Sequence, residues 1–222
     1  MRTAIARLAL AAAVLLGALA TGPAARADAW SDANCSGGGT SMSTWKRSQA
    51  IAYAQPPLKE GYALAGGCYK LNDKDDTPLL AADQGGEGTD CSGFVFRVWA
   101  LKADGSSGYR YWDYGKDIHG PYLTWDYEGA TTSDPFKIIS KSLKSTDPMD
   151  ALVWNRSYEQ HIAMIWQEGS SSDLFIHAHN NSVGVEISEE IYRQYSDAKA
   201  VQRKAWTPEC YPKCPGTGVR RP

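Results

Sequence analysis

The stretch "GEGTDCSGFVFRVWAL", Gly86 to Leu101, joins a glycine-rich loop to an apolar segment and places a cysteine at the junction. The apolar residues recur at helical spacing; they are Phe94, Val95, Val98, Trp99 and Leu101. We predict that a helix begins at Cys91 and packs one face on the core. The free N–H groups and dipole of that helix end lower the pKa of a thiol and bind an oxyanion. The alternative is that Cys91 is a small buried hydrophobe.

After residue 150 the pattern changes to short apolar segments separated by turn residues, which is typical of strands. Strands are predicted at 151–154, 161–167, 173–178, 183–187 and 200–206. Upstream, residues 43–55 predict a helix with Ser43 as its N-cap, stopped by Pro56 and Pro57. Helices followed by a run of adjacent strands indicate an α+β fold with an antiparallel sheet, in one domain over residues 43–206.

Two segments lack clear periodicity. Residues 66–89 carry turn residues throughout and are predicted to form a long loop. Residues 106–148 begin with many aromatic residues. The rings of 109–127 are interpreted as packing on the core rather than binding a sugar, although they could also line a cleft.

The first 27 residues resemble a secretory signal peptide. Arg2 and Arg7 precede an apolar run, and a small-x-small cleavage site stands before Asp28. The apolar run, Leu8 to Ala20, has 13 residues, which is shorter than the roughly 20 needed for a membrane anchor. We therefore expect a secreted, extracellular protein with no membrane insertion after the signal is removed.

Removal of the signal takes three arginines with it and leaves a net charge of −5. An acidic balance offers no footprint for nucleic acid or for an anionic membrane surface. We expect a monomer with neither of these partners.

Five cysteines in an exported chain cannot all pair within it. Cys210 and Cys214 could close a short disulfide loop in the tail, 207–222. Cys35, in the N-terminal arm 28–42, could pair with Cys68. Cys91 is then left as a free thiol, although counting alone leaves the connectivity open.

A cysteine nucleophile needs a base, and the base needs an orienting partner. His161 begins the predicted strand 161–167, and alternation places His177 and His179 on one face of the next strand. Alternation does not choose between these two as the partner. A zinc site of Cys91, His161 and His177 lacks any compact ligand spacing, so we expect no metal and no cofactor.

The motif "TDCSGFVFRVW" resembles the Asp-Cys-Ser-Gly signature of the NlpC-type cell-wall cysteine peptidases, a papain-like group. "MDALVWNRSYEQHIAMIWQ" is similar to the Gly-Asp strand and the His-Val-Gly-Ile-Tyr strand of that family, and "FIHA" to its third-residue strand. "QAIAYAQ" and "GYALAGG" resemble its first helix and its approach to the cysteine. Met149 stands where the family has glycine, and the segments 66–89 and 103–148 are longer than usual.

The resemblance implies a papain-like NlpC-type fold in which the nucleophile's helix packs on the sheet. Cys91 would be the nucleophile, His161 the base and His177 the orienting residue. Asp90, Ser92 and Tyr62 would bind substrate.

The implied activity is hydrolysis of amide bonds in peptidoglycan stem peptides, such as a D-glutamyl–diamino acid bond, through a thioester and without a metal. Two alternatives stay open. One is an amidase or acyltransferase that acts outside the wall. The other is a non-catalytic binding or toxin-like module.

Overall fold

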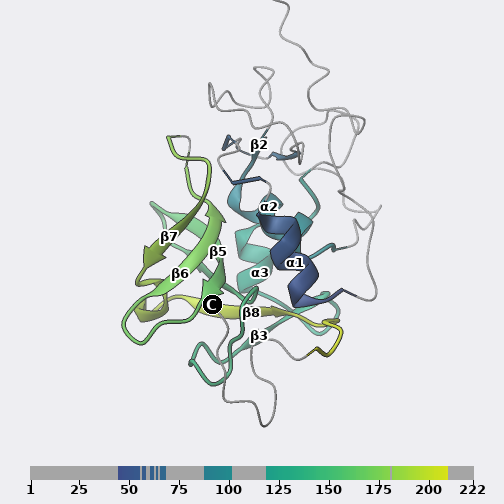
Figure 1. Ribbon diagram of the computed structural model, residues 1–222. Coiled ribbons are helices and arrows are strands. Elements are labelled where there is room, and N and C mark those ends of the chain that lie inside the picture. The colour runs from purple at the N-terminus through teal and green to yellow at the C-terminus, as the bar shows by residue number, and fades with distance from the viewer. Residues whose placement is uncertain are drawn as a thin grey trace, which may run out of the picture.

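The computed structural model describes residues 45–55, 57–58, 61–62, 64, 66–68, 88–101, 119–180 and 182–209. Within them lies a six-stranded antiparallel sheet of order β3-β8-β4-β5-β6-β7, with helices packed against it (Figure 1). The strands are β3 (Phe136–Ile139), β4 (Ala151–Asn155), β5 (Gln160–Gln167), β6 (Asp173–Ala178), β7 (Val185–Glu190) and β8 (Lys199–Arg203). The prediction of an α+β fold with an antiparallel sheet is confirmed.

Three α-helices accompany the sheet: α1 (Arg47–Ala54), α2 (Cys91–Val98) and α3 (Thr124–Glu128). As predicted, α2 begins at Cys91. The prediction of Ser43 as the N-cap of α1 is wrong, because the cap is Lys46, whose backbone N–H donates to Gln49 Oε1 at 3.0 Å. Neither α3 nor β3 was predicted. Helix α3 is shorter than the window over which helical periodicity can be recognised, and the β3 sequence FKII does not alternate.

The central strands β4, β5 and β6 are buried on both faces of the sheet. One face packs on the helices through Val153, Ile162, Met164, Ile176 and Ala178. The other face holds a second apolar cluster formed by Leu152, Trp154, Ala163, Ile165, Phe175, Tyr192, Ala198 and Ala200. Burial on both faces explains why the strand sequences read as nearly continuous apolar runs.

Two short strands connect the ends of the predicted loop 66–89. β1 (Gly67–Cys68) pairs with β2 (Gly88–Thr89). The Asp90 N–H donates to the Gly66 carbonyl at 2.8 Å. This ladder fixes the main chain immediately before Cys91. Residues 69–87 lie outside the described residues.

An unusual turn precedes β4. Met149 has a φ of 70°, which is left-handed backbone that disfavours any residue with a Cβ. Its carbonyl accepts a hydrogen bond from Trp99 Nε1 at 2.7 Å, and Arg47 Nη1 donates to the Pro148 carbonyl at 2.5 Å. The helices thus hold the turn in its left-handed form, and Met149 is fully buried.

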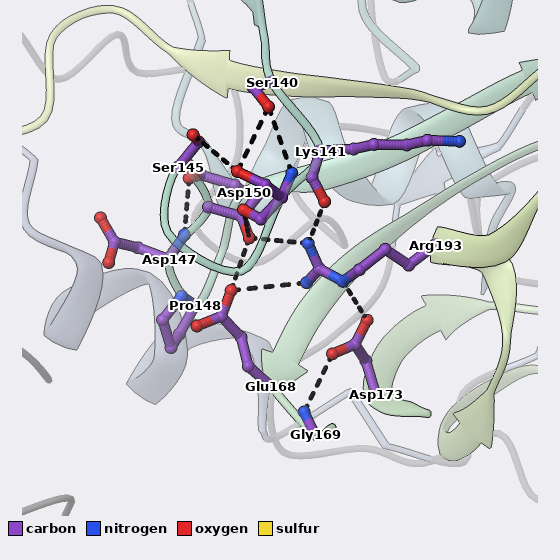
Figure 2. A network of polar contacts seen from close by, with 12 residues as sticks. Ser140, Lys141, Ser145, Asp147, Pro148, Asp150, Glu168, Gly169, Asp173 and Arg193 are labelled. Atoms are coloured by element: carbon purple, nitrogen blue, oxygen red, sulfur yellow. Dashed lines mark hydrogen bonds and ion pairs between the residues drawn. The ribbon is translucent and has the colours of Figure 1, made fainter. Parts of the chain in front are cut away.

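A second polar network fastens the segment before that turn to the β5–β6 hairpin (Figure 2). Its centre is Arg193, on a single 3-10 turn, η3 (Tyr192–Gln194). The guanidinium donates to Asp173 at 2.8 Å and to the Lys141 carbonyl at 2.5 Å, and it lies 3.4 Å from Glu168. These contacts hold in place the loop that leads to β4 and the hairpin that carries β5.

The aromatic segment packs on the core where it is described. Tyr127 is fully buried and its ring centroid lies 4.5 Å from that of Phe136. The packing interpretation is confirmed for Tyr122 and Tyr127, whereas Trp125 is exposed. Residues 109–118 lie outside the described residues.

The segments predicted as signal peptide (1–27) and N-terminal arm (28–42) also lie outside, as do Cys35, Cys210 and Cys214, and nothing is described of the Cys68 side chain. None of the helices in the described part of the chain has the length and hydropathy needed to cross a bilayer.

Candidate active site

Cys91 is the first residue of α2 and lies against strand β5. Its side chain is a free thiol and only 6% of the residue is exposed. The backbone N–H groups of Cys91, Ser92 and Ile162 face the sulfur and favour its thiolate form. Because Ile162 follows His161 directly, the thiol lies beside the main chain of the predicted base.

The pKa of the Cys91 thiol differs from the one expected for a thiol at a helix N-terminus. Burial, and after it the Asp90 carboxylate, raise the pKa of Cys91 to about 12 against the lowering effect of the three N–H groups. The N–H groups of the helix end act in the predicted direction, but the net pKa of this thiol is raised rather than lowered. Desolvation of a charged sulfur outweighs the helix dipole at this buried position.

Asp90 and Ser92 form a buried network on the other side of Cys91. Asp90 caps α2, because its Oδ1 accepts from the Gly93 N–H at 2.7 Å. The Ser92 hydroxyl donates to the same oxygen at 3.0 Å, and His119 Nε2 lies 3.0 Å from it. Burial would raise the pKa of Asp90, but His119, Gly93 and Ser92 together hold it below its ordinary value.

This network identifies a residue that the sequence analysis did not select. His119 is 2% exposed and its Nδ1 lies 2.7 Å from the Gly120 carbonyl. It comes from the aromatic segment, where no periodicity marked it. Asp90 and Ser92, predicted to contact substrate, hydrogen-bond with His119 and with the first turn of α2.

The predicted base and its partner form a pair. His161 Nε2 and His177 Nδ1 are 2.7 Å apart, and both residues are buried. Burial lowers the pKa of each imidazole well below its ordinary value, so both rings are neutral. Of the two histidines that alternation left open, His177 is the one bonded to His161. His179 instead lies 2.5 Å from Glu186.

The strand β7 determines which ring nitrogens carry protons. The Ser188 hydroxyl donates its single proton to Glu190 Oε1 at 3.0 Å. Its oxygen must then accept from His177 Nε2 at 2.9 Å, which leaves His177 Nδ1 as an acceptor. His161 therefore donates from Nε2, and its Nδ1 holds a lone pair that can take a proton. We call this chain, from Glu190 through Ser188 and His177 to His161, the proton relay.

A pocket opens beside these residues. It has a volume of about 430 Å³ and is lined by Tyr62, His179, Asn180, Ser182 and Val183. Tyr62 also lies near Cys91 and Asp90. Burial, together with these two neighbours, raises the pKa of its phenol. Tyr62 thus connects the start of α2 with the turn between β6 and β7.

The predicted site residues are brought to one end of the sheet, but not into one bonded triad. Trp154 contacts the His161 ring from the second apolar cluster, with centroids 5.2 Å apart. Cys91 belongs to the first cluster, on the helix side. Within the described part of the chain, no hydrogen bond joins the Cys91 thiol to the His161 ring. Strand alternation explains why the Ile162 side chain, rather than His161, points toward α2.

No protein-family model matches the chain, and neither a curated protein nor a solved structure matches it. The function is therefore inferred from the chemistry of these side chains.

Proposed function

We propose that the protein is a secreted cysteine peptidase of the papain-like NlpC type, which hydrolyses amide bonds in peptidoglycan stem peptides. One observation carries this proposal. A free thiol at a helix N-terminus lies beside the strand that bears a hydrogen-bonded pair of neutral histidines. A nucleophile, a base and a residue that orients the base are the parts that acyl transfer requires.

In the proposed reaction, substrate binding or an opening of the pocket beside Tyr62 exposes the thiol and brings the His161 ring to it. Cys91 Sγ then attacks the amide carbonyl and the thiol proton passes to His161 Nδ1. The imidazolium then gives that proton to the departing amine, and a thioester remains on Cys91. Water hydrolyses the thioester with His161 again as the base, which yields a carboxylic acid and restores the thiol. The Cys91 and Ser92 N–H groups are suited to binding the oxyanion.

The raised pKa of Cys91 and the lowered pKa of His161 make both partners neutral at rest. Proton transfer therefore has to accompany attack on the carbonyl, as general base catalysis rather than through a preformed ion pair. The proton relay supports that role because it keeps His161 Nδ1 free of a proton.

One observation favours a second candidate, a non-catalytic binding module that retains the fold. The Cys91 thiol is nearly inaccessible and is not hydrogen-bonded to the His161 ring. A thiol in that state is an inert core residue unless the substrate, or an opening of the pocket beside Tyr62, exposes it.

The test is digestion of purified peptidoglycan by the mature chain, with mass spectrometry of the released peptides. We expect new amine and carboxylate ends in stem peptides, lost in Cys91→Ala and in His161→Ala. Tyr158→Ala, which truncates an 81% exposed side chain on the β4–β5 hairpin, is the control. Binding of peptidoglycan without cleavage would favour the module. Cleavage of other amides only would favour the amidase or acyltransferase alternative.

A further inference from the structure

We infer that His177, His179 and Glu186 form a binding site for a divalent transition-metal ion such as Zn²⁺. One ligand atom from each of the three residues lies within 4.8 Å of the other two. Two imidazoles and one carboxylate are a ligand set that zinc accepts, with a fourth position left for water. This inference does not depend on the proposed peptidase activity.

Two of the three residues stand on paired strands, and the third follows directly after one of them. His177 lies on β6, directly opposite Glu186 on β7. His179 follows two residues later on the same face, and its backbone N–H donates to the Gly184 carbonyl at 2.8 Å. The two histidine rings are stacked, with centroids 4.7 Å apart. Ligands held on paired strands lose little conformational freedom when they bind an ion.

The distances require only small side-chain movements. Ligand atoms about 2.0–2.1 Å from a tetrahedral zinc ion lie roughly 3.4 Å from one another. His179 Nδ1 and Glu186 Oε1, now 2.5 Å apart, would separate slightly as the ion replaces the proton between them. The more distant pair would close from at most 4.8 Å.

An ion can reach the site from solvent. The side chains of His179 and Glu186 are 33% and 29% exposed, whereas His177 is buried beneath them. His179 also lines the pocket shared with Tyr62. The fourth position would thus be open to water or to a donor group that enters the pocket.

Metal binding would alter the proton relay. If the ion binds His177 Nδ1, it takes the place of the hydrogen bond from His161. If the ion binds His177 Nε2, the proton of His177 moves to Nδ1 and is donated to His161 Nε2, as the second ring nitrogen of a metal-bound histidine commonly does. His161 then carries its own proton on Nδ1 and can no longer accept one. In either case Zn²⁺ opposes the arrangement that makes His161 a base.

The experiment is a Zn²⁺ titration of the untagged mature chain against a chromophoric chelator. Four variants are compared with it: His179→Gln, Glu186→Gln, Cys91→Ser and Glu189→Gln. Glu189 is an exposed acidic neighbour on β7 and serves as the matched control. We expect one Zn²⁺ per chain, at least a tenfold loss of affinity in His179→Gln and in Glu186→Gln, and no change in the other two variants.

Circular dichroism establishes that each variant is folded, so that a loss of binding can be assigned to a lost ligand. Three results would overturn the inference. These are no binding by the folded wild-type chain, equal affinity in His179→Gln and wild type, or a loss of binding in Cys91→Ser. The last would place the ion between Cys91 and the histidines instead. Because the readout is metal binding, a chain that does not cleave peptidoglycan would leave this result unaffected.

Discussion

Removing the Arg47 guanidinium should destabilise the folded protein, because it leaves a buried charge unpaired beneath the turn that leads into β4. Asp150 is fully buried, and Arg47 Nη2 lies 2.8 Å from its Oδ1. The guanidinium also stands over the Trp206 ring, 4.9 Å from its centroid. Arg47→Met keeps most of the side-chain volume but leaves the carboxylate without its counter-charge. Breaking a buried ion pair in this way costs about 3–5 kcal/mol.

The pH dependence of this loss has a definite sign. Burial already raises the pKa of Asp150, and Arg47 opposes that rise. In Arg47→Met the opposing charge is gone, so the folded-state pKa rises further above the unfolded value. The folded variant then binds more protons than the unfolded chain, and its stability increases as the pH falls through the folded pKa toward about 4. The deficit relative to wild type should shrink by up to about 1.4 kcal/mol per pH unit between the folded pKa of Asp150 in the variant and its lower, but also raised, folded pKa in the wild type.

Urea unfolding followed by tryptophan fluorescence at pH 7.5, 6.5 and 5.5 measures this. Arg156→Met is the matched control, because Arg156 pairs with Asp197 at the surface, with Nε and Oδ2 2.6 Å apart. Its loss should be several-fold smaller and nearly independent of pH. Asp150→Asn added to Arg47→Met should recover much of the stability. Equal losses in the two arginine variants, or a deficit that does not shrink on acidification, would refute the assignment of Asp150 as an uncompensated buried charge.

Three further predictions concern α2 and the relay. Ala100→Gly should stabilise the protein by about 0.5–1 kcal/mol in calorimetry. The reason is that Ala100, just after the end of α2, has a φ of 46°. An unchanged or lower stability would contradict the backbone strain at this residue. Above pH ~9, wild type should lose stability relative to Cys91→Ala by up to about 1.4 kcal/mol per pH unit. The reason is that burial raises the pKa of the folded thiol to about 12. If the free energies of unfolding in urea change in parallel for the two proteins from pH 8 to 10.5, the thiol is not desolvated. Ser188→Ala should move the proton of His161 from Nε2 toward Nδ1 in nitrogen NMR and lower peptidoglycan cleavage by roughly 10-fold or more, whereas an unchanged tautomer would show that the relay does not control His161.

Much of the framework could be predicted because local pattern and tertiary environment agree there. Helix α2 begins at the residue that the glycine-to-apolar transition indicated, and its cap is the adjacent Asp90. Strands β4, β5 and β6 match the predicted segments to within a residue at each end. As alternation along a strand requires, His161 lies with Ala163 and Ile165 on the face of the second apolar cluster. In these elements apolar periodicity is a direct consequence of which face is buried.

Other features depend on contacts that no local pattern records. His119 joins Asp90 across 29 positions, and Arg47 reaches Pro148 across 101. The left-handed Met149 is tolerated because hydrogen bonds to its neighbours hold that turn, although its side chain alone disfavours it. The protonation of His161 is set two strands away, at Glu190.

Local pattern predicts a cysteine at a helix start and the strands that carry the histidines, because periodicity and capping act over a few residues. Contacts between distant segments are needed to show that His177 bonds to His161 while His179 contacts Glu186, and that the thiol's pKa is raised. Those outcomes depend on the register of β6 against β7 and on how completely the core excludes water around Cys91. Both are set by packing among segments far apart in the chain.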